Sequence, residues 1–392
     1  MVYVGIDVAK VKHDCCILGP DGEILKDSFT FANNKRGFDE LHDAIISAKT
    51  ENGFDEVRAG LEATGHYSIN LVAFLEKIGL QPVIFNPLSI NLFRKAQTLR
   101  KTKTDKTDAR FIASMLLTSD PSPHAPLSYH IVELKNLTRS RSRLVKNRSK
   151  LKVSLRRLLD IIFPELDSLV WSKNQHSVHH LLLELPNAQA IAHCRIDRLT
   201  NILKAGSKGK YGREKALTIR QAAVESIGSN SPSRAFELQQ TIRLIQNVQS
   251  EITLLDKEIA ALVKESRTPL ITIPGIGFTL AGIITAEIGD INRFKTPAKL
   301  LAFAGMEPST YQSGKFNASQ TPMVKRGSSY LRWAILQAAR LVAMRDRTFA
   351  DYMDKKRSEG KHFLVAQSHV GKKLIRVIFH MLKTNRVFVP QS

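Results

Sequence analysis

The spacing of hydrophobic and polar positions changes along the chain, and the change separates two kinds of structure. Short apolar runs bounded by turn residues predict strands, and longer runs with apolar residues three or four apart predict helices. The predicted strands cover residues 2–6, 14–18, 24–31, 56–63 and 82–86, and the predicted helices cover 36–50, 69–79 and the stretch up to 118. A three-stranded meander followed by alternating helices and strands predicts an α/β domain with a mixed sheet.

Two long amphipathic segments follow. In residues 129–162 the apolar positions keep helical spacing, and between Leu137 and Leu158 every charged residue is basic. A coiled coil normally mixes charge signs, so we expect this helix also to contact nucleic acid. The expected contacts are Arg139, Arg141, Arg143, Lys146, Arg148, Lys150, Lys152, Arg156 and Arg157. A second heptad-like helix, from Leu238 to Leu262, has balanced charge and predicts packing or dimerisation.

The last third of the chain opens with the turn PGIG at residues 274–277 between apolar helices. Such a turn is typical of a helix-hairpin-helix element, in which glycines let backbone N–H groups approach a phosphate. A tight structural turn explains the same residues equally well. In the region between the two long helices, His179 and His180 are expected on a helix surface.

Charge narrows the choice of partner. The 392 residues include 58 Lys and Arg against 36 Asp and Glu, which gives a formal net charge of +22. Such a field favours nucleic acid over an anionic membrane, because the basic residues are spread over the whole chain and no apolar run reaches the length of a spanning helix. No signal peptide is evident, and Cys15, Cys16 and Cys194 form no disulfide or zinc pattern, so we expect a reduced, cytoplasmic protein.

Four acids are candidates for one metal site. Asp7 and Glu62 end predicted strands, where sites form in open α/β sheets, and Asp105 and Asp108 lie one helical turn apart. Carboxylates that cluster need cations, and their hard oxygens suit Mg²⁺ or Mn²⁺. The alternative for Asp105 and Asp108 is charge balance on a solvated basic helix. Asp14 lies mid-hairpin and is expected to face solvent. The order of elements, with acids at strand ends, predicts a ribonuclease-H-like fold.

A set of short motifs adds a family resemblance. These are GIDVAK at 5–10, EATGHY at 62–67, NP at 86–87, TDKTDA at 104–109, IPGIG at 273–277, FAGMEPSTYQSGK at 303–315 and KRGSSYLR at 325–332. In order and spacing they resemble the DEDD transposases of the IS110 insertion-sequence family, relatives of the Piv DNA invertases. The match runs from near residue 2 to about 345.

The resemblance implies an architecture and a chemistry. We expect a nuclease-like domain similar to the RuvC junction resolvase at 1–125, a helical coiled-coil region at 126–265 and a mostly helical transposase domain at 266–392. Asp7, Glu62, Asp105 and Asp108 take the positions of the metal-binding acids, and Ser313 that of the serine that links to DNA. Gln312 departs from the small residue usual before this serine, and Ser309 lies close by. Lys325 and Arg326 supply nearby positive charge for nucleic acid.

Three functions remain open at this stage. A recombinase of bacterial or archaeal origin would need the acids and Ser313, would act on donor and target double-stranded DNA and, by the resemblance, would use a structured guide RNA and join active sites across protomers. A junction-resolving nuclease would need the acids alone. A noncatalytic nucleic-acid-binding scaffold would need neither. The two heptad-bearing helices predict at least a homodimer, and a tetramer on DNA.

Overall fold

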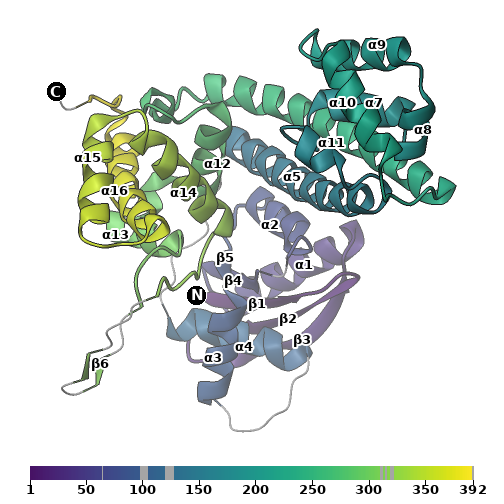
Figure 1. The fold of residues 1–392 in the computed structure, drawn as a ribbon. Coiled ribbons are helices and arrows are strands. Elements are labelled where there is room, and N and C mark those ends of the chain that lie inside the picture. The colour runs from purple at the N-terminus through teal and green to yellow at the C-terminus, as the bar shows by residue number, and fades with distance from the viewer. Residues whose placement is uncertain are drawn as a thin grey trace. The chain divides into compact units, whose positions relative to one another are not determined.

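The chain divides into two compact units, residues 1–127 and 128–392. The computed structural model describes residues 1–63, 65–97, 105–119, 128–309, 312–313, 316–317 and 322–390. For residues 105–106, 312–313 and 316–317 it describes the backbone without the side chains. The first unit is a sheet covered by helices, and the second is mostly helical (Figure 1).

The first unit is built on a five-stranded mixed sheet with the order β3-β2-β1-β4-β5. β1 pairs antiparallel with β2, which pairs antiparallel with β3, while β4 lies parallel to β1 and β5 parallel to β4. The strands are β1 (Val2–Val8), β2 (Lys12–Leu18), β3 (Ile24–Ala32), β4 (Val57–Glu62) and β5 (Val83–Phe85). This meander with parallel additions confirms the predicted mixed sheet and is consistent with a ribonuclease-H-like fold.

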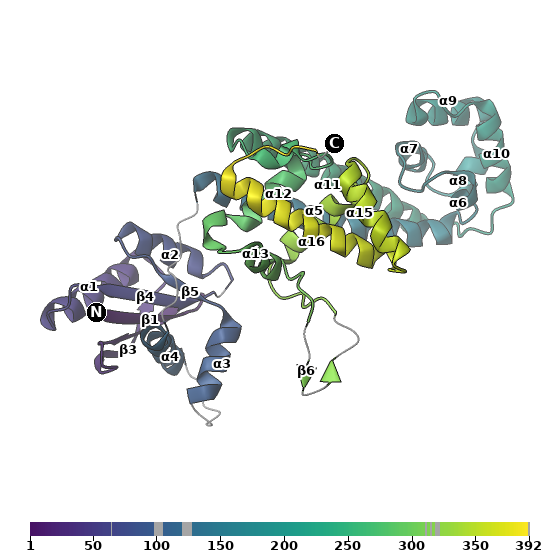
Figure 2. The same cartoon turned by 90° about the vertical axis from the view of Figure 1, so that its left-hand side faces the viewer.

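Helices cover both faces of this sheet (Figure 2). The even-numbered residues of β1, from Val2 to Val8, pack against Leu41, Ile45 and Leu71 on one face. On the other face Cys16 and Leu18 pack against α4. The helices are α1 (Lys35–Glu51), α2 (Ser68–Lys77), α3 (Pro87–Gln97) and α4 (Asp105–Thr118). Since both faces are apolar along much of β1 and β2, polar residues in these strands stand out.

The second unit is organised around two long helices, α5 (Tyr129–Ile162) and α11 (Pro232–Glu265). Arg141 on α5 bonds Asp256 on α11 at 2.6 Å, whereas Arg157, four turns later, bonds Glu237, so the helices run antiparallel. The two predicted apolar seams therefore face each other within one chain. For that reason the seams no longer argue for self-association, and both the coiled coil and the homodimer stay predictions.

A hydrophobic core lies toward each end of this pair. Short helices α6–α10 pack on one end, around Leu158, Leu181 and Ile242, and α12–α16 pack on the other, around Leu134 and Ile259. The backbone N–H of Ser229 donates to Ile161 O at 2.8 Å, so the chain leaves and rejoins the pair at one point. The short helices are α6 (Leu166–Leu169), α7 (His176–Glu184), α8 (Ala188–His193), α9 (Ile196–Ser207) and α10 (Arg213–Val224).

The C-terminal elements surround the second core. They are η1 (Pro269–Thr272), α12 (Phe278–Ile288), η2 (Ile291–Arg293), α13 (Pro297–Phe303), β6 (Gln312–Ser313), β7 (Phe316–Asn317), α14 (Ser329–Ala343), α15 (Arg347–Ser358) and α16 (Phe363–Thr384). In the PGIG turn, Gly275 has φ +96°, and a Cβ there would lie 2.8 Å from the backbone of Leu341. This glycine is required by packing on α14. A phosphate contact by the turn stays a prediction.

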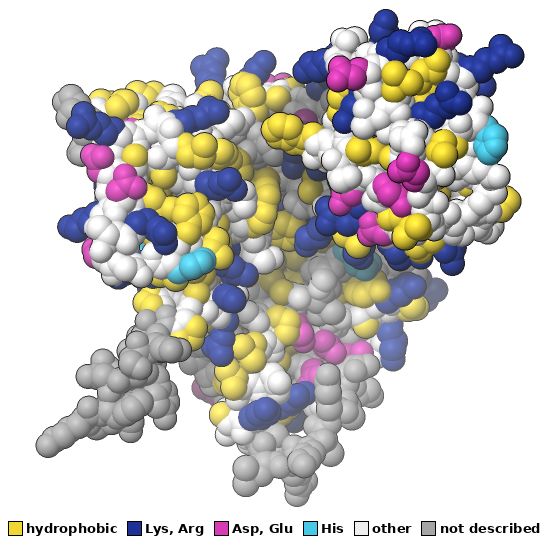
Figure 3. All heavy atoms as spheres, in the orientation of Figure 1, with side chains coloured by type: hydrophobic (Ala, Val, Ile, Leu, Met, Phe, Trp, Pro, Cys, Tyr) yellow, Lys and Arg dark blue, Asp and Glu magenta, His cyan; other side chains and the backbone are white. Residues whose placement is uncertain are grey.

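Basic residues are spread widely over one face of the molecule. Figure 3 shows Lys and Arg side chains over much of the face drawn, with hydrophobic side chains between them. Within the described part of the chain, no helix is both long enough and apolar enough to cross a membrane.

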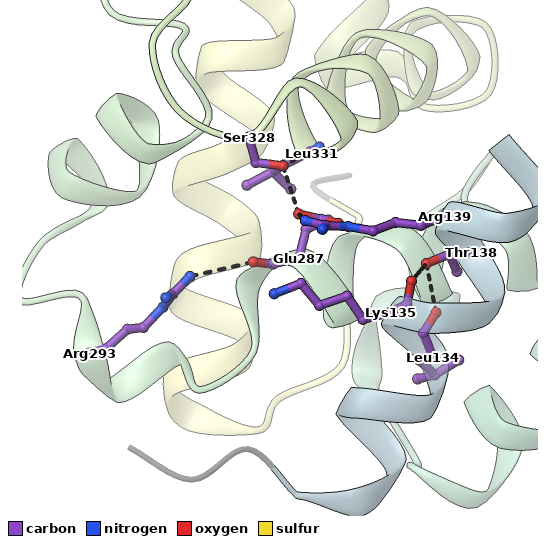
Figure 4. Close-up of polar contacts among 8 residues, drawn as sticks. All are labelled: Leu134, Lys135, Thr138, Arg139, Glu287, Arg293, Ser328 and Leu331. Atoms are coloured by element: carbon purple, nitrogen blue, oxygen red, sulfur yellow. Dashed lines mark hydrogen bonds and ion pairs between the residues drawn. The ribbon is translucent and has the colours of Figure 1, made fainter. Parts of the chain in front are cut away.

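A buried carboxylate joins three helices of the second unit. Glu287 of α12, 2% exposed, accepts hydrogen bonds from Arg139 Nε at 2.8 Å and Nη2 at 3.1 Å, and from Ser328 Oγ at 2.7 Å (Figure 4). Ser328 Oγ in turn caps α14 by accepting from the N–H of Leu331. Burial alone would raise the pKa of the Glu287 carboxyl, but these hydrogen bonds and the charges of Arg139 and Lys135 outweigh it and lower that pKa. The ionised carboxylate thus ties α5, α12 and the start of α14 together.

Glu287→Gln is expected to lower the free energy of unfolding by about 1.5–3 kcal/mol at pH 7, because it leaves Arg139 without its charge partner in a partly buried site. A group with a lowered folded pKa stabilises above its unfolded pKa, and that stability is lost as pH falls through the folded value. The difference between variant and wild type should therefore narrow below pH 4.5, the ordinary value for this carboxyl. Urea denaturation at pH 7 and pH 3.5 measures it.

The matched control is Glu237→Gln, which removes the half-exposed pair with Arg157 on the same helix pair. A surface pair contributes roughly 0–1 kcal/mol, so the control should differ little from wild type. Equal destabilisation by the two variants would show that the hydrogen bonds of Glu287 contribute no more to stability than a surface ion pair does.

Candidate functional site

Parallel pairing brings two of the predicted acids to one end of the sheet. The register of β1 and β4 runs from Val2 opposite Val57 to Ile6 opposite Leu61. Asp7 and Glu62 are the next residue on each strand, so their backbones are about 4.8 Å apart, the spacing of neighbouring strands. Because side chains alternate along a strand, both point to the face that α4 covers. The two acids thus lie on neighbouring strands at one end of the sheet, and their role as metal ligands stays a prediction.

The helix α4 lies on this face because Gly5 has no side chain. A Cβ on Gly5 would lie 2.2 Å from Ala109 O and 2.3 Å from Ala113 N, so any other residue would force the helix away. Asp108 immediately precedes Ala109 and is 6% exposed. Its Oδ1 accepts a hydrogen bond from Arg94 Nη1 of α3 at 3.1 Å. Asp108 is thus buried on the helix that covers this face, and a guanidinium neutralises its charge.

A further carboxylate occupies the same face. Asp14 is the Cα partner of Asp7 on β2, is 4% exposed and accepts from Thr30 Oγ1 at 2.5 Å. The expectation that Asp14 faces solvent is therefore wrong. Its strand neighbours Cys16 and Leu18 pack under α4, so alternation places Asp14 on the α4 face. Glu62, Asp7 and Asp14 stand in one row across β4, β1 and β2.

The acids do not form a complete ligand shell. Among the residues whose side chains are described, no three of His, Cys, Asp or Glu lie close enough together to hold a metal ion. The side chain of Asp105, the fourth predicted ligand, lies outside the described residues. The donor set still fits Mg²⁺ or Mn²⁺ in kind, since carboxylate oxygens are the ligands that these ions prefer.

Ser313 lies on a hairpin of the second unit. β6 and β7 pair antiparallel, with Ser313 opposite Phe316. Further back along this hairpin, Ser309 N donates to Pro322 O at 2.8 Å. Ser309 therefore belongs to the base of the hairpin and Ser313 to its outer part. The side chain of Ser313 lies outside the described residues.

The turn that follows the hairpin is held in an unusual shape. Lys325 has φ +59°, and its carbonyl accepts from Arg332 Nη1 of α14 at 3.0 Å. Ser328 N donates to Phe303 O at 2.8 Å, which ties the turn to α13. The side chains of Lys325 and Arg326 are both exposed. The fold thus presents two cations on a fixed turn, in keeping with their predicted role toward nucleic acid.

The basic residues of α5 fall into two groups. Arg139 and Arg141 are held in ion pairs with Glu287 and Asp256, and Arg148 bonds Gln249. These three bind other helices of the same unit, so the structure gives each a packing role. The residues of the predicted strip that lie exposed on the helix are Arg143, Lys146, Lys150, Arg156 and Arg157, of which Arg157 pairs with Glu237 of α11. The contact with nucleic acid stays a prediction, and these exposed residues are its best candidates.

Comparison with known proteins agrees with this arrangement. Residues 4–164 match a family of DEDD transposases of the IS110 type, described as "Transposase", and residues 267–354 match one described as "Transposase IS116/IS110/IS902 family". Over 99% of its length the chain is 27% identical to the insertion element IS116 44.8 kDa protein of Streptomyces clavuligerus, covering 96% of that protein. Over 98% of its length it is 24% identical to the pilin gene-inverting protein of Moraxella bovis, covering 97% of it.

The two family matches occur in the order of the two units. The first contains the acid-bearing sheet, and the second contains the Ser313 hairpin and the start of α14. Together with the similarity along the whole length, they show that this chain belongs to the IS110/IS116/IS902 family of transposases.

Proposed function

We propose that this chain is a DNA recombinase that cuts and rejoins strands to move an insertion element. The observation that carries the proposal is that both family matches lie where the chemistry would need them, one around the row of acids and one around Ser313. The pilin gene-inverting relatives support it, since their name describes the inversion of a DNA segment.

Asp7, Glu62, Asp105 and Asp108 would hold a divalent cation, Mg²⁺ or Mn²⁺. Such an ion, when bound, stabilises negative charge on a phosphoryl oxygen and lowers the pKa of a nucleophile. The backbone of α4, fixed over Gly5, would hold Asp105 and Asp108 one turn apart on the helix face. Asp14 would act as a positioning residue, because it lies opposite Asp7 and is itself held by Thr30.

Ser313 would be the nucleophile. Its Oγ attacks a backbone phosphorus, the bond to the bridging oxygen of the cut strand breaks, and the serine proton ends on that oxygen. The strand is then linked to the protein through a phosphoserine ester. A second strand end can reverse the step, so rejoining needs no external energy source.

Nucleic-acid partners follow from charge and from the family. The exposed cations of α5, together with Lys325 and Arg326, would contact backbone phosphates. We further propose a structured guide RNA and a homodimer that forms a tetramer on DNA. The guide RNA rests on the family resemblance. The homodimer rests on it too, because the apolar seams of α5 and α11 are used within the chain.

A junction-resolving nuclease is the competing function. The carboxylates at the end of a ribonuclease-H-like sheet favour it, and it would use water where the recombinase uses Ser313. The distinction is therefore testable at one side chain.

Ser313→Ala is expected to eliminate the covalent protein–DNA adduct and strand exchange while DNA binding persists. The adduct is measured as a slower band on a denaturing gel after trapping mid-reaction. Ser309→Ala, at the base of the same hairpin, is the matched control and should retain the adduct. An adduct that maps to another residue, or cleavage that survives Ser313→Ala, would favour the nuclease.

Asp14→Asn should slow strand exchange by about 10–100-fold, the usual cost of losing a group that orients a metal ligand. The loss should be partly recovered at higher Mg²⁺ or Mn²⁺, which a purely structural defect would not show. Asp43→Asn, on the exposed surface of α1, is the control and should behave as wild type. Full activity of Asp14→Asn at low metal concentration would remove Asp14 from the site.

Reversing Arg143, Lys150 and Arg156 to Glu should weaken DNA binding and flatten its dependence on salt. Each lost phosphate contact reduces the slope of log affinity against log salt by about 0.9 on duplex DNA. Reversing Arg234, Arg243 and Lys257, exposed cations of α11, to Glu gives the same change of net charge and is the control for net charge alone. If the slope is unaltered in the α5 variant, these residues do not contact the backbone.

A further inference from the structure

One cavity of the second unit is lined mostly by residues outside both family matches. It has a volume of about 360 Å³ and is bounded by α5, by the turn before α7, by α7 and by α11. Its polar lining includes Arg148, Lys152, Asn174, His176, His179 and Gln249. Residues 165–266, which supply all of these except Arg148 and Lys152, fall between the two matched segments.

Two buried polar atoms in this lining have no hydrogen-bond partner among the described residues. They are Nε2 of His179, a residue only 6% exposed, and Oδ1 of Asn174. The expectation that His179 lies on a helix surface is thus wrong. Buried polar atoms are almost always satisfied, so atoms like these indicate a water or a ligand in the cavity.

The charge of the lining is of one sign. Arg148 and Lys152 line the cavity, and none of its lining residues is acidic. Burial and the neighbouring Arg148 lower the pKa of Lys152. Burial, Lys152 and His176 lower the pKa of His179 to about 4. The cations therefore oppose one another, and a negative charge among them would relieve that repulsion.

We infer that this cavity binds one nucleotide of a nucleic-acid strand, with its phosphate at Lys152 and at Arg148, which bonds Gln249 through Nη1 and has further N–H donors. A phosphate provides several acceptor oxygens for these donors and for His179. Asn174 Oδ1 is an acceptor and needs a donor, which a sugar hydroxyl or a base amino group supplies and a bare phosphate does not. The volume lies in the lower range of sites for small ligands, roughly 300–1,000 Å³.

A strand is favoured over a free nucleotide because cations continue along the same helix. Arg148, Lys152 and Arg156 are spaced four residues apart on α5, so they lie along one face of the helix, and Arg156 is exposed. Arg156 can contact the neighbouring phosphate of a strand that enters the cavity. This inference rests on the proposed function only in naming nucleic acid as the source of the phosphate. It requires no cleavage chemistry.

The test compares two variants of the full-length chain with wild type. Lys152→Gln removes the charge and keeps the alkyl stem, and Asn174→Asp places a carboxylate beside the phosphate. Each should weaken binding of a fluorescent single-stranded oligonucleotide by about tenfold. Lys257→Gln, an exposed lysine of α11 outside the cavity, is the matched control and should change affinity by less than about twofold. Circular dichroism verifies that each variant folds.

A second measurement uses inorganic phosphate and follows the His179 imidazole by NMR. Saturating phosphate should raise the pKa of His179 above about 4 in wild type and not in Lys152→Gln, because an anion favours the imidazolium form. His13, buried in the first unit, is the internal reference, and phosphate should not change its pKa.

Three results would overturn the inference. If neither phosphate nor oligonucleotide changes the pKa of His179, the cavity holds water. If phosphate raises the pKa of His179 but Lys152→Gln leaves the affinity for the oligonucleotide unchanged, the site binds a free anion and not a strand. If Lys257→Gln weakens oligonucleotide binding as much as Lys152→Gln does, the loss of affinity comes from net charge and not from the cavity. Binding is also measured in the Ser313→Ala background, so that failure of the recombinase proposal leaves this test intact.

Discussion

The antiparallel contact between α5 and α11 is the interaction on which the second unit depends. Each helix has 34 residues, and its apolar stripe is covered by the other helix and by a core toward each end. Ion pairs along the seam, such as Arg141 with Asp256, select the register, because a shift by one turn would leave a charge facing apolar atoms. The C-terminal helices are then oriented through Glu287, which accepts hydrogen bonds from α5 and from the start of α14.

In the first unit the corresponding constraint is the close approach of α4 to β1. The approach is possible only because Gly5 leaves room for the backbone at Ala109. It places Asp108 in a buried position, where Arg94 compensates its charge. A cation that binds the acids would compete with this guanidinium for the same carboxylate. The arginine thus offsets the cost of burying the Asp108 carboxylate.

Much of this fold was predictable, because it follows from local periodicity. The five strands and both long helices were predicted within a few residues, since alternation and helical spacing depend on neighbouring positions alone. The partner of a helix is not local information. The stripes of α5 and α11 are compatible with two chains or with one, and only the structure shows that Arg141 meets Asp256 within the chain.

For the same reason, some residues of the candidate site could be predicted from the sequence and others could not. Asp7 and Glu62 follow apolar strands, so their place at the sheet end could be read from the sequence. Asp14 was misplaced because "DCCIL" has apolar residues on both faces, and a strand covered on both sides has no solvent face for a polar residue. His179 was misplaced because its neighbours suggest an exposed helix, whereas burial comes from α5 and α11, which are distant in sequence.

The return of the chain at Ser229 to the end of α5 has a consequence for how such a protein can change during evolution. Since the ends of the α6–α10 segment meet at one hydrogen bond, the whole segment is topologically a loop between two paired helices. The entropy of closing a loop grows only slowly with its length, so insertions or deletions there need not alter the register of α5 on α11. The segment is therefore free to diverge in length and content, and a new binding specificity can arise in it without disturbing the contact between α5 and α11.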